Sequence, residues 1–346
     1  MFYPLNFTNR TVTASLLALG LLTITPNTIA QTRLDGVVQE NNGLWSHAPD
    51  EIKVFHGDEF KKAHKVAISV FNVAFPNKNT FTANAKGTSG GWGTSHEASM
   101  ETSISGVDHS TQQRITDKAY QLFVEQLKSA GYDVVSQAEL TRLAPEFSKW
   151  DARPNFSQGR YGSYVAPTGL PLYFLPGDES KRDISGMFGE LNSIVSRGVD
   201  STQAYKRSAY IANEGGIGII AVTLVMDYGV YSTTGERRSF GGLSKVGFKP
   251  GLTIGAGNLT DSGSLLEFWS PNSGGFPAAA YLQIPVRSEI PFWTADGFKD
   301  LPDLNVKGLT KKEASIVADP VKFEAAANEV SAIAIPKLIK IMTDGR

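Results

Sequence analysis

The sequence predicts an α/β fold in which helices flank a mixed central sheet, with an α+β arrangement as the alternative. Two segments, 65–75 and the first half of 216–231, are apolar at both odd and even positions. A strand with this pattern is covered on both faces, which favours the centre of a sheet. Amphipathic helical patterns separate the two segments, so strands and helices alternate along the chain.

Composition divides the chain into four parts. We assign a cleaved signal peptide to 1–30, an N-terminal arm to 31–64, the α/β body to 65–300 and a C-terminal helical segment to 301–346. Long insertions at 76–110 and 146–178 interrupt the body. Structureless insertions of this length are uncommon inside a compact domain, so we expect the first to face a partner or a membrane.

The first thirty residues have the pattern of a targeting segment. Arg10 precedes a mostly apolar stretch, 11–24, and Thr28-Ile29-Ala30 offers a cleavage site. That stretch is short of the roughly 20 residues that span a bilayer, so we predict cleavage after Ala30. The mature protein is expected in the periplasm, at the outer membrane or outside a bacterial cell.

The remaining composition excludes several kinds of site. The chain has no cysteine, which removes disulfides, thiolate metal sites and lipidation of an N-terminal cysteine. Without Arg10, 32 basic side chains (33 minus 1) face 34 acidic ones. This balance shows no nucleic-acid footprint. The glycine-rich runs lack the phosphate-binding patterns, so no cofactor is predicted.

The first half of the body alternates strand and helix. Ser110 and Gln113 form a capping box for a helix that ends before Gly131. A strand at 132–135 follows, and a second capping box opens at Ser136 with Glu139. Weak alternation at 100–107 predicts a hairpin within the first insertion.

The second half places helices at 183–196 and 201–214 before the central strand, with Gly215-Gly216 ending the second helix. Thr233 to Gly235 is predicted as a turn. The glycine-rich stretch 240–259 and strands at 265–269 and 278–286 form a β-meander that completes the sheet.

The C-terminal segment is predicted to be helical. After a polar linker at 301–309, Thr310 and Glu313 cap a short helix. Asp319 and Pro320 suit the start of a second helix, which Pro336 kinks or ends. Its apolar stripe comprises Phe323, Ala326, Ala327, Val330 and Ala334.

Catalytic motifs are weak. Ser89 lies in a G-x-S-x-G pattern, but no helix start follows it and no histidine lies beyond His109. We interpret this segment as a flexible loop. Asp227 and Glu267 lie near predicted strand ends and could form a pair of hydrolase carboxylates, but exposed strand-end acids are the simpler interpretation. The five histidines lack metal-ligand spacing, and no metal site is predicted.

Aromatic residues offer an interaction surface instead. We name Trp92, Phe81, Phe248 and Trp269 as interaction candidates. The chain has five tryptophans, Trp45, Trp92, Trp150, Trp269 and Trp293. If they are exposed, they favour a carbohydrate-binding or surface-binding module; if they are buried, they belong to the core.

Three segments resemble the CsgG-like curli secretion family. Residues 68–73 are similar to its early strand "VSVYNI", 134–143 to its "strand, Glu-Arg, x, x, Leu" segment and 221–228 to its "small-residue, strand, Gly-Tyr" segment. The likeness covers roughly 65–290. The stretch 241–265 stands where the family has membrane-inserting hairpins, but Lys245, Lys249 and Pro250 interrupt its alternation.

The resemblance implies an α/β envelope-assembly or secretion accessory that works through protein contacts. The family's members are usually lipoproteins, whereas this chain has no cysteine to acylate. We expect a non-enzymatic protein that associates with itself or with other envelope proteins and that contacts the outer membrane through β-structure. A periplasmic or secreted hydrolase and a carbohydrate-binding module are the alternatives.

Overall fold

The structure is a computed structural model that describes most of the chain beyond residue 51. The described residues are 52–86, 95–150, 152–158, 162–173, 199–236, 243–255, 264–273, 277–282, 284–294, 304–307 and 310–344. They all belong to one compact unit, Leu34–Arg346. The predicted signal peptide and the helix predicted at 183–196 lie outside the described residues.

A mixed sheet forms the centre of the body, with its strands in the order β1-β11-β10-β8-β2-β7-β6. The strands are β1 Ile52–Phe55, β2 Lys65–Pro76, β6 Phe156–Gln158, β7 Gly162–Val165, β8 Gly218–Glu236, β10 Leu265–Trp269 and β11 Ala278–Leu282. β2 runs parallel to β8 and to the short β5, Asp133–Val135, and antiparallel to β7. The predicted α/β class with a mixed sheet is confirmed.

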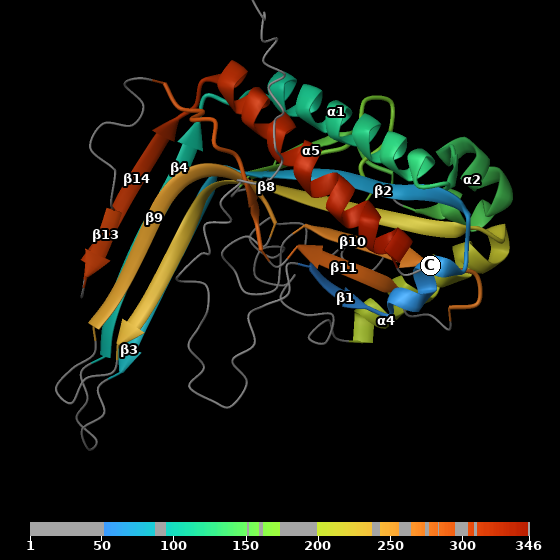
Figure 1. Ribbon diagram of the computed structural model, residues 1–346, viewed down its shortest axis with the longest axis horizontal. Coiled ribbons are helices and arrows are strands. Elements are labelled where there is room, and N and C mark those ends of the chain that lie inside the picture. Colours follow the sequence, from blue (N-terminus) through green and yellow to red (C-terminus); the bar gives the residue numbers. More distant parts are fainter. Residues whose placement is uncertain are drawn as a thin grey trace, which may run out of the picture. The chain divides into compact units, whose positions relative to one another are not determined.

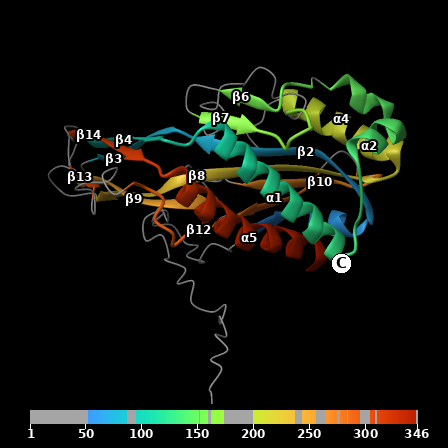
Figure 2. The same cartoon turned by 90° about the horizontal axis from the view of Figure 1, so that it is seen from above.

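Helices cover both faces of this sheet (Figure 2). They are α1 His109–Ser129, α2 Gln137–Leu143, α4 Val199–Gly215 and α5 Pro320–Asp344, with 3₁₀ helices η1 Gly57–Lys61 and η2 Pro145–Lys149. Along β2, Ile68 and Phe71 pack in the core that contains α1 and α5. Ala67 and Val70 pack in the core that contains α2, η2 and α4. β2 is therefore covered on both faces, as its sequence predicts.

The start of α1 differs from the predicted capping box. The N-cap is Asp108, whose Oδ1 accepts a 2.8 Å hydrogen bond from the backbone N–H of Thr111. Ser110, the predicted cap, donates its hydroxyl to the same carboxylate at 3.0 Å. The side chain of Gln113 points to a loop, where it donates to the Ala166 carbonyl at 2.9 Å. The next cap is as predicted, because Ser136 accepts from the N–H of Glu139.

Helix α5 begins as the sequence predicts. Asp319 Oδ1 accepts from the N–H groups of Val321 and Lys322, and the apolar stripe of the helix is buried. Pro336 does not end the helix, which continues to Asp344. Proline removes one helical hydrogen bond and crowds the preceding turn, but buried residues on both sides of it hold the helix together.

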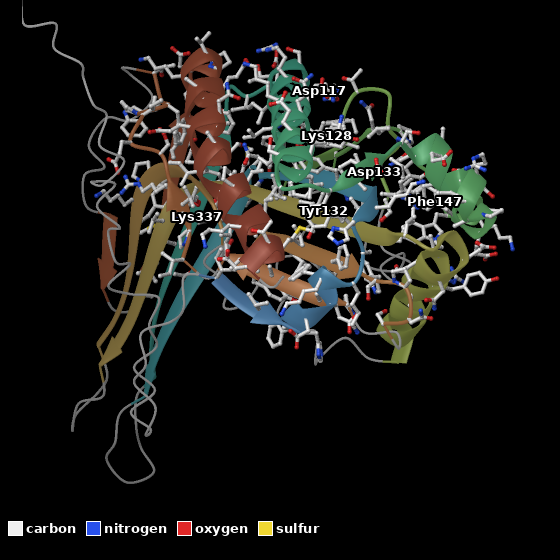
Figure 3. The ribbon with its side chains drawn as sticks, turned by 45° about the vertical axis from the view of Figure 1, so that its right-hand side comes forward. Asp117, Lys128, Tyr132, Asp133, Phe147 and Lys337 are labelled. Atoms are coloured by element: carbon white, nitrogen blue, oxygen red, sulfur yellow. The ribbon has the colours of Figure 1, made fainter. Side chains whose placement is uncertain are left out.

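Contacts at both ends of α5 attach it to the body. Near its start, Glu324 accepts from Arg114 at 2.9 Å and from Lys118 at 2.8 Å, both on α1. Near its end, the Tyr132 hydroxyl lies 3.2 Å from the Met342 carbonyl, and Figure 3 shows Tyr132 beside these last turns. The hydroxyl provides a partner for a carbonyl that the helix end leaves unpaired.

Beyond the helix-covered body, long strands form what we call the hairpin extension (Figure 1). It comprises β3 Lys78–Lys86, β4 Ser95–Ser105, β9 Leu243–Ile254, β13 Leu304–Lys307, β14 Thr310–Val317 and the part of β8 after residue 225. One layer has the order β14-β4-β3, and in the other β9 lies between β8 and β13. The predicted insertion 76–110 is thus mostly a hairpin.

Three predictions in this region are wrong. The predicted turn Thr233 to Gly235 continues the pairing of β8 with β9. The predicted linker 301–309 contains β13, and the short helix predicted from Thr310 is strand β14. In β14, buried Ala314 and Ile316 alternate with exposed neighbours, a period of two that no helix shares.

The end of the predicted N-terminal arm joins the body. β1 pairs with β11 at the edge of the sheet. Phe60 of η1 is fully buried and lies 5.5 Å, ring centroid to ring centroid, from Phe268. Residues 52–64 therefore belong to the folded body, and Phe60 and Ala63 join its core.

The cap of α1 provides a stability test. Asp108→Ala should lower the free energy of unfolding by about 1 kcal/mol, because it leaves the Thr111 N–H without its acceptor. Ser110→Ala removes the predicted cap and should change the free energy much less. Urea unfolding of both variants measures the difference, and a larger loss for Ser110→Ala would contradict the observed cap.

Candidate functional site

The point where β8 leaves the body is the most distinctive polar site among the described residues. β8 pairs with β2 as far as Val225, and from Met226 onward it pairs with β9. The pairing shifts register between Asp227 and Gly229, which marks a β-bulge. Bulges bend a strand and redirect its side chains. The residues at this bulge, Asp227 to Gly229, therefore join the body to the hairpin extension, and we call this region the junction.

Asp227 is the buried acid of this junction. Its Oδ1 accepts hydrogen bonds from Asn79 Nδ2 of β3 at 3.0 Å and from the N–H of Tyr228 at 2.7 Å. Burial raises the pKa of the Asp227 carboxyl from 3.8 to about 7, and the N–H groups of Tyr228, Asn79 and Gly229 only partly oppose this rise in pKa. Desolvation outweighs these three donors because none of them carries a charge that would stabilise the carboxylate.

Tyr228 makes a second link between two hairpins, the first formed by β3 and β4 and the second by β8 and β9. Its hydroxyl donates to the Thr102 carbonyl of β4 at 2.9 Å and lies 3.1 Å from the Thr102 hydroxyl. The ring packs edge-on against Phe248 of β9, with centroids 6.3 Å apart. A Cβ at Gly229 would lie 1.9 Å from the Phe248 ring, so only glycine fits beneath that ring. The bulge thus brings β3, β4, β8 and β9 together.

The adjoining strands complete the junction. Thr253 of β9 lies opposite Asp227 and donates its hydroxyl to the Asp227 carbonyl at 3.4 Å. On the far side of β9, Arg287 of β12 (Val286–Arg287) lies opposite Thr253. Its Nη2 donates to the Pro250 carbonyl at 3.1 Å. The arginine thus links β12 to β9 at Pro250.

The hydrogen bonds of Asp227 and Tyr228 tie β8 to the strands β3 and β4. The residues around the Asp227 carboxyl provide amide and hydroxyl groups, and no histidine is among the partners described above. Among the described residues, no group of three or more histidine, cysteine or acidic side chains could hold a metal ion. The part of the chain that the structure describes has no helix long and apolar enough to span a membrane.

Comparison with known proteins gives no relative. No protein-family model matches the chain, and no curated protein or solved structure matches it. The functional assignment therefore depends on the sequence and on the geometry described here.

The two candidate carboxylates are buried and far apart. Asp227 is 4% exposed and Glu267 is 1% exposed, so the interpretation as exposed strand-end acids is wrong. Glu267 lies opposite Ala221, which is six residues before Asp227 on β8. At the rise of an extended strand this is a separation of about 20 Å. Paired hydrolase carboxylates lie roughly 5 to 10 Å apart, so this pair does not fit that chemistry. Ser89 lies outside the described residues.

Two of the four aromatic interaction candidates lie in the core. Phe248 is 4% exposed beside Tyr228, and Trp269 is fully buried. Phe81 lies on β3 opposite Met100, with its side chain outside the described part. Trp92 lies outside the described residues. Phe248 therefore acts within the junction, and Trp269 packs with α4 against the sheet.

The partners of Asp227 and Tyr228 at the junction are not evident from local sequence patterns. Asn79 and Thr102 lie opposite each other in the β3–β4 hairpin, 148 and 126 residues from their partners on β8. A signal was present, because Ala98, Met100 and Thr102 alternate with polar residues. Lys249 is exposed between buried Phe248 and Pro250, so its charge does not enter the core.

The packing at Gly229 provides a test of the junction. Gly229→Ala should lower the free energy of unfolding by about 1 to 3 kcal/mol, because the new methyl group overlaps the Phe248 ring. Phe248→Leu opens that space, so the double variant should lose less than the sum of the two single variants. Thermal unfolding of the three variants measures this coupling, and strict additivity would contradict the contact.

Proposed function

We propose that the protein is an exported, non-enzymatic component of the bacterial envelope or cell surface that acts through protein contacts made by the hairpin extension. The observation that supports this most directly is the extension itself (Figure 1). Two hairpins from distant parts of the sequence run side by side past the helices. The targeting pattern at the N-terminus supports export.

The edges of the extension are suited to strand pairing. β14 pairs with β4 on one side, and the described residues provide no strand on its other side. The Ala318 N–H donates to the Ser105 carbonyl of β4, whereas the Val317 carbonyl accepts from Thr294 on the opposite side. Successive backbone groups alternate in direction, so the Ser315 N–H points away from β4. An added strand would find a donor there.

The resemblance to CsgG-like proteins suggests the same role, as an assembly or secretion accessory that associates with itself or with other envelope proteins. The extension is also where we place contact with an outer membrane, because it is the β-structure that lies outside the helix-covered body (Figure 1).

The first experiment measures the mass of the chain without residues 1–30. Light scattering on a sizing column, with and without mild detergent, should show a defined oligomer if the extension pairs with a second copy. A monomer under both conditions, with no partner recovered by crosslinking in envelope fractions, would overturn the proposal.

A variant of the β14 edge tests where the contact lies. Ser315→Pro removes the outward N–H and leaves the bonds to β4 in place, so it should weaken self-association at least tenfold. Ser315→Ala is the matched control, because it keeps the N–H and should associate as the unaltered chain does. Equal association constants for both variants would place the contact elsewhere.

A further inference from the structure

Polar bonds and an apolar interface together hold the two hairpins against each other. The apolar part consists of Ala98 and Met100 of β4 and Val246 and Phe248 of β9, all buried in one cluster. The polar part lies at the junction, where Asp227 and Tyr228 form hydrogen bonds with β3 and β4. A change at the junction therefore acts on both hairpins together.

The residues of β3 and β4 that bond to Asp227 and Tyr228 at the junction are neutral. The residue of β3 that bonds to it is the neutral Asn79. The preceding residue, Lys78, lies on the opposite face of the hairpin and pairs with Glu101 at 2.6 Å. The residue of β4 on the junction side is the neutral Thr102. The charged residues of this hairpin near the junction thus neutralise each other on its outer face.

The strands on the other side are also neutral toward the carboxyl. β9 presents Thr253, and its Lys249 is exposed. Arg287 of β12 is separated from Asp227 by Thr253 and bonds to Pro250. Among the described residues, Asp227 is therefore a buried acid whose hydrogen-bond partners are neutral donors.

We propose that this junction is a pH-operated latch: the two hairpins stay closed on each other while Asp227 is neutral, and they separate at the junction when Asp227 is ionised. Opening the junction lets water reach the carboxylate, which the closed junction prevents. It also breaks the hydrogen bond between Asn79 of β3 and Asp227, and it uncovers the apolar faces around Met100 and Phe248. This pH response is a property of the chain itself and does not depend on which partner the extension binds.

The direction of the effect follows from the two protonation equilibria. In the closed junction the pKa of Asp227 is raised to about 7, whereas a hydrated carboxyl has its ordinary pKa of 3.8. Closure is therefore fully favoured below pH 3.8 and loses stability as the pH rises through 7. The ratio of open to closed molecules should rise roughly 50-fold from pH 5 to pH 7 and less than about twofold per unit beyond pH 7.5.

The absence of cysteine makes a direct test available. A single thiol at Ala98→Cys, in the full chain, is buried on the inner face of β4 and reacts only when the hairpins separate. Ala280→Cys, equally buried in the body strand β11, is the matched control. Labelling uses an aromatic disulfide that reacts in acid as well as at neutral pH. Each rate is divided by the rate of a small free thiol at the same pH.

The latch predicts that the normalised rate at Ala98→Cys rises roughly 50-fold from pH 5 to pH 7 and then levels off, while the rate at Ala280→Cys changes less than about threefold. In the Asp227→Asn background, which is neutral at every pH, the rate at Ala98→Cys should stay flat within about threefold. Circular dichroism confirms that this background is folded.

Three results would overturn the latch. The first is a labelling rate at Ala98→Cys that does not change with pH while Asp227 is intact, because opening would then be independent of the ionisation of Asp227. The second is an equal rise at both thiols, which indicates global unfolding. The third is a rise that persists in Asp227→Asn. Repeating the measurement at two protein concentrations separates the latch from self-association, because opening within one chain is independent of concentration.

Discussion

The parallel pairing of β2 with β8 is the interaction on which the rest of the structure depends. From Val66 to Ala74 it is buried on both faces, so it anchors both helical layers. Each strand then leaves the body at the same end of the pair. β2 ends at Pro76 and the chain continues into β3, while β8 continues for eleven residues beyond Val225. Because the two strands are neighbours, the two hairpins emerge side by side.

The sequence identifies the body well because its strands and helices have strong periodicity. Both central strands, the cap at Ser136 and the start of α5 are found from local pattern alone. The extension is harder to predict, because its buried positions include small or polar residues such as Ala98 and Thr102. β14 is mistaken for a helix because a three-residue cap pattern matches by chance, whereas its true partner, β4, lies far away in the sequence.

The junction shows why site prediction is only partly successful. Asp227 stands out in the sequence as an acid at the end of an apolar run. Whether such an acid is exposed depends on what lies against it, and here that is Asn79 from a hairpin 148 residues earlier. Long-range packing sets the burial, and burial sets the chemistry of the carboxyl. A single sequence does not show which distant segment packs against a given residue.

The pairing of β4 with β14 has a consequence for how the molecule folds. Ser103 and Ser315 contact each other across a separation of 212 residues, and the two strands run in parallel. Because synthesis starts at the N-terminus, β4 is made long before β14 arrives to cover its edge. Closing so long a loop is slow, and an uncovered strand edge readily pairs with other chains. The edge of β4 in the outer layer of the extension can therefore be covered only after the residues just before α5 have been made.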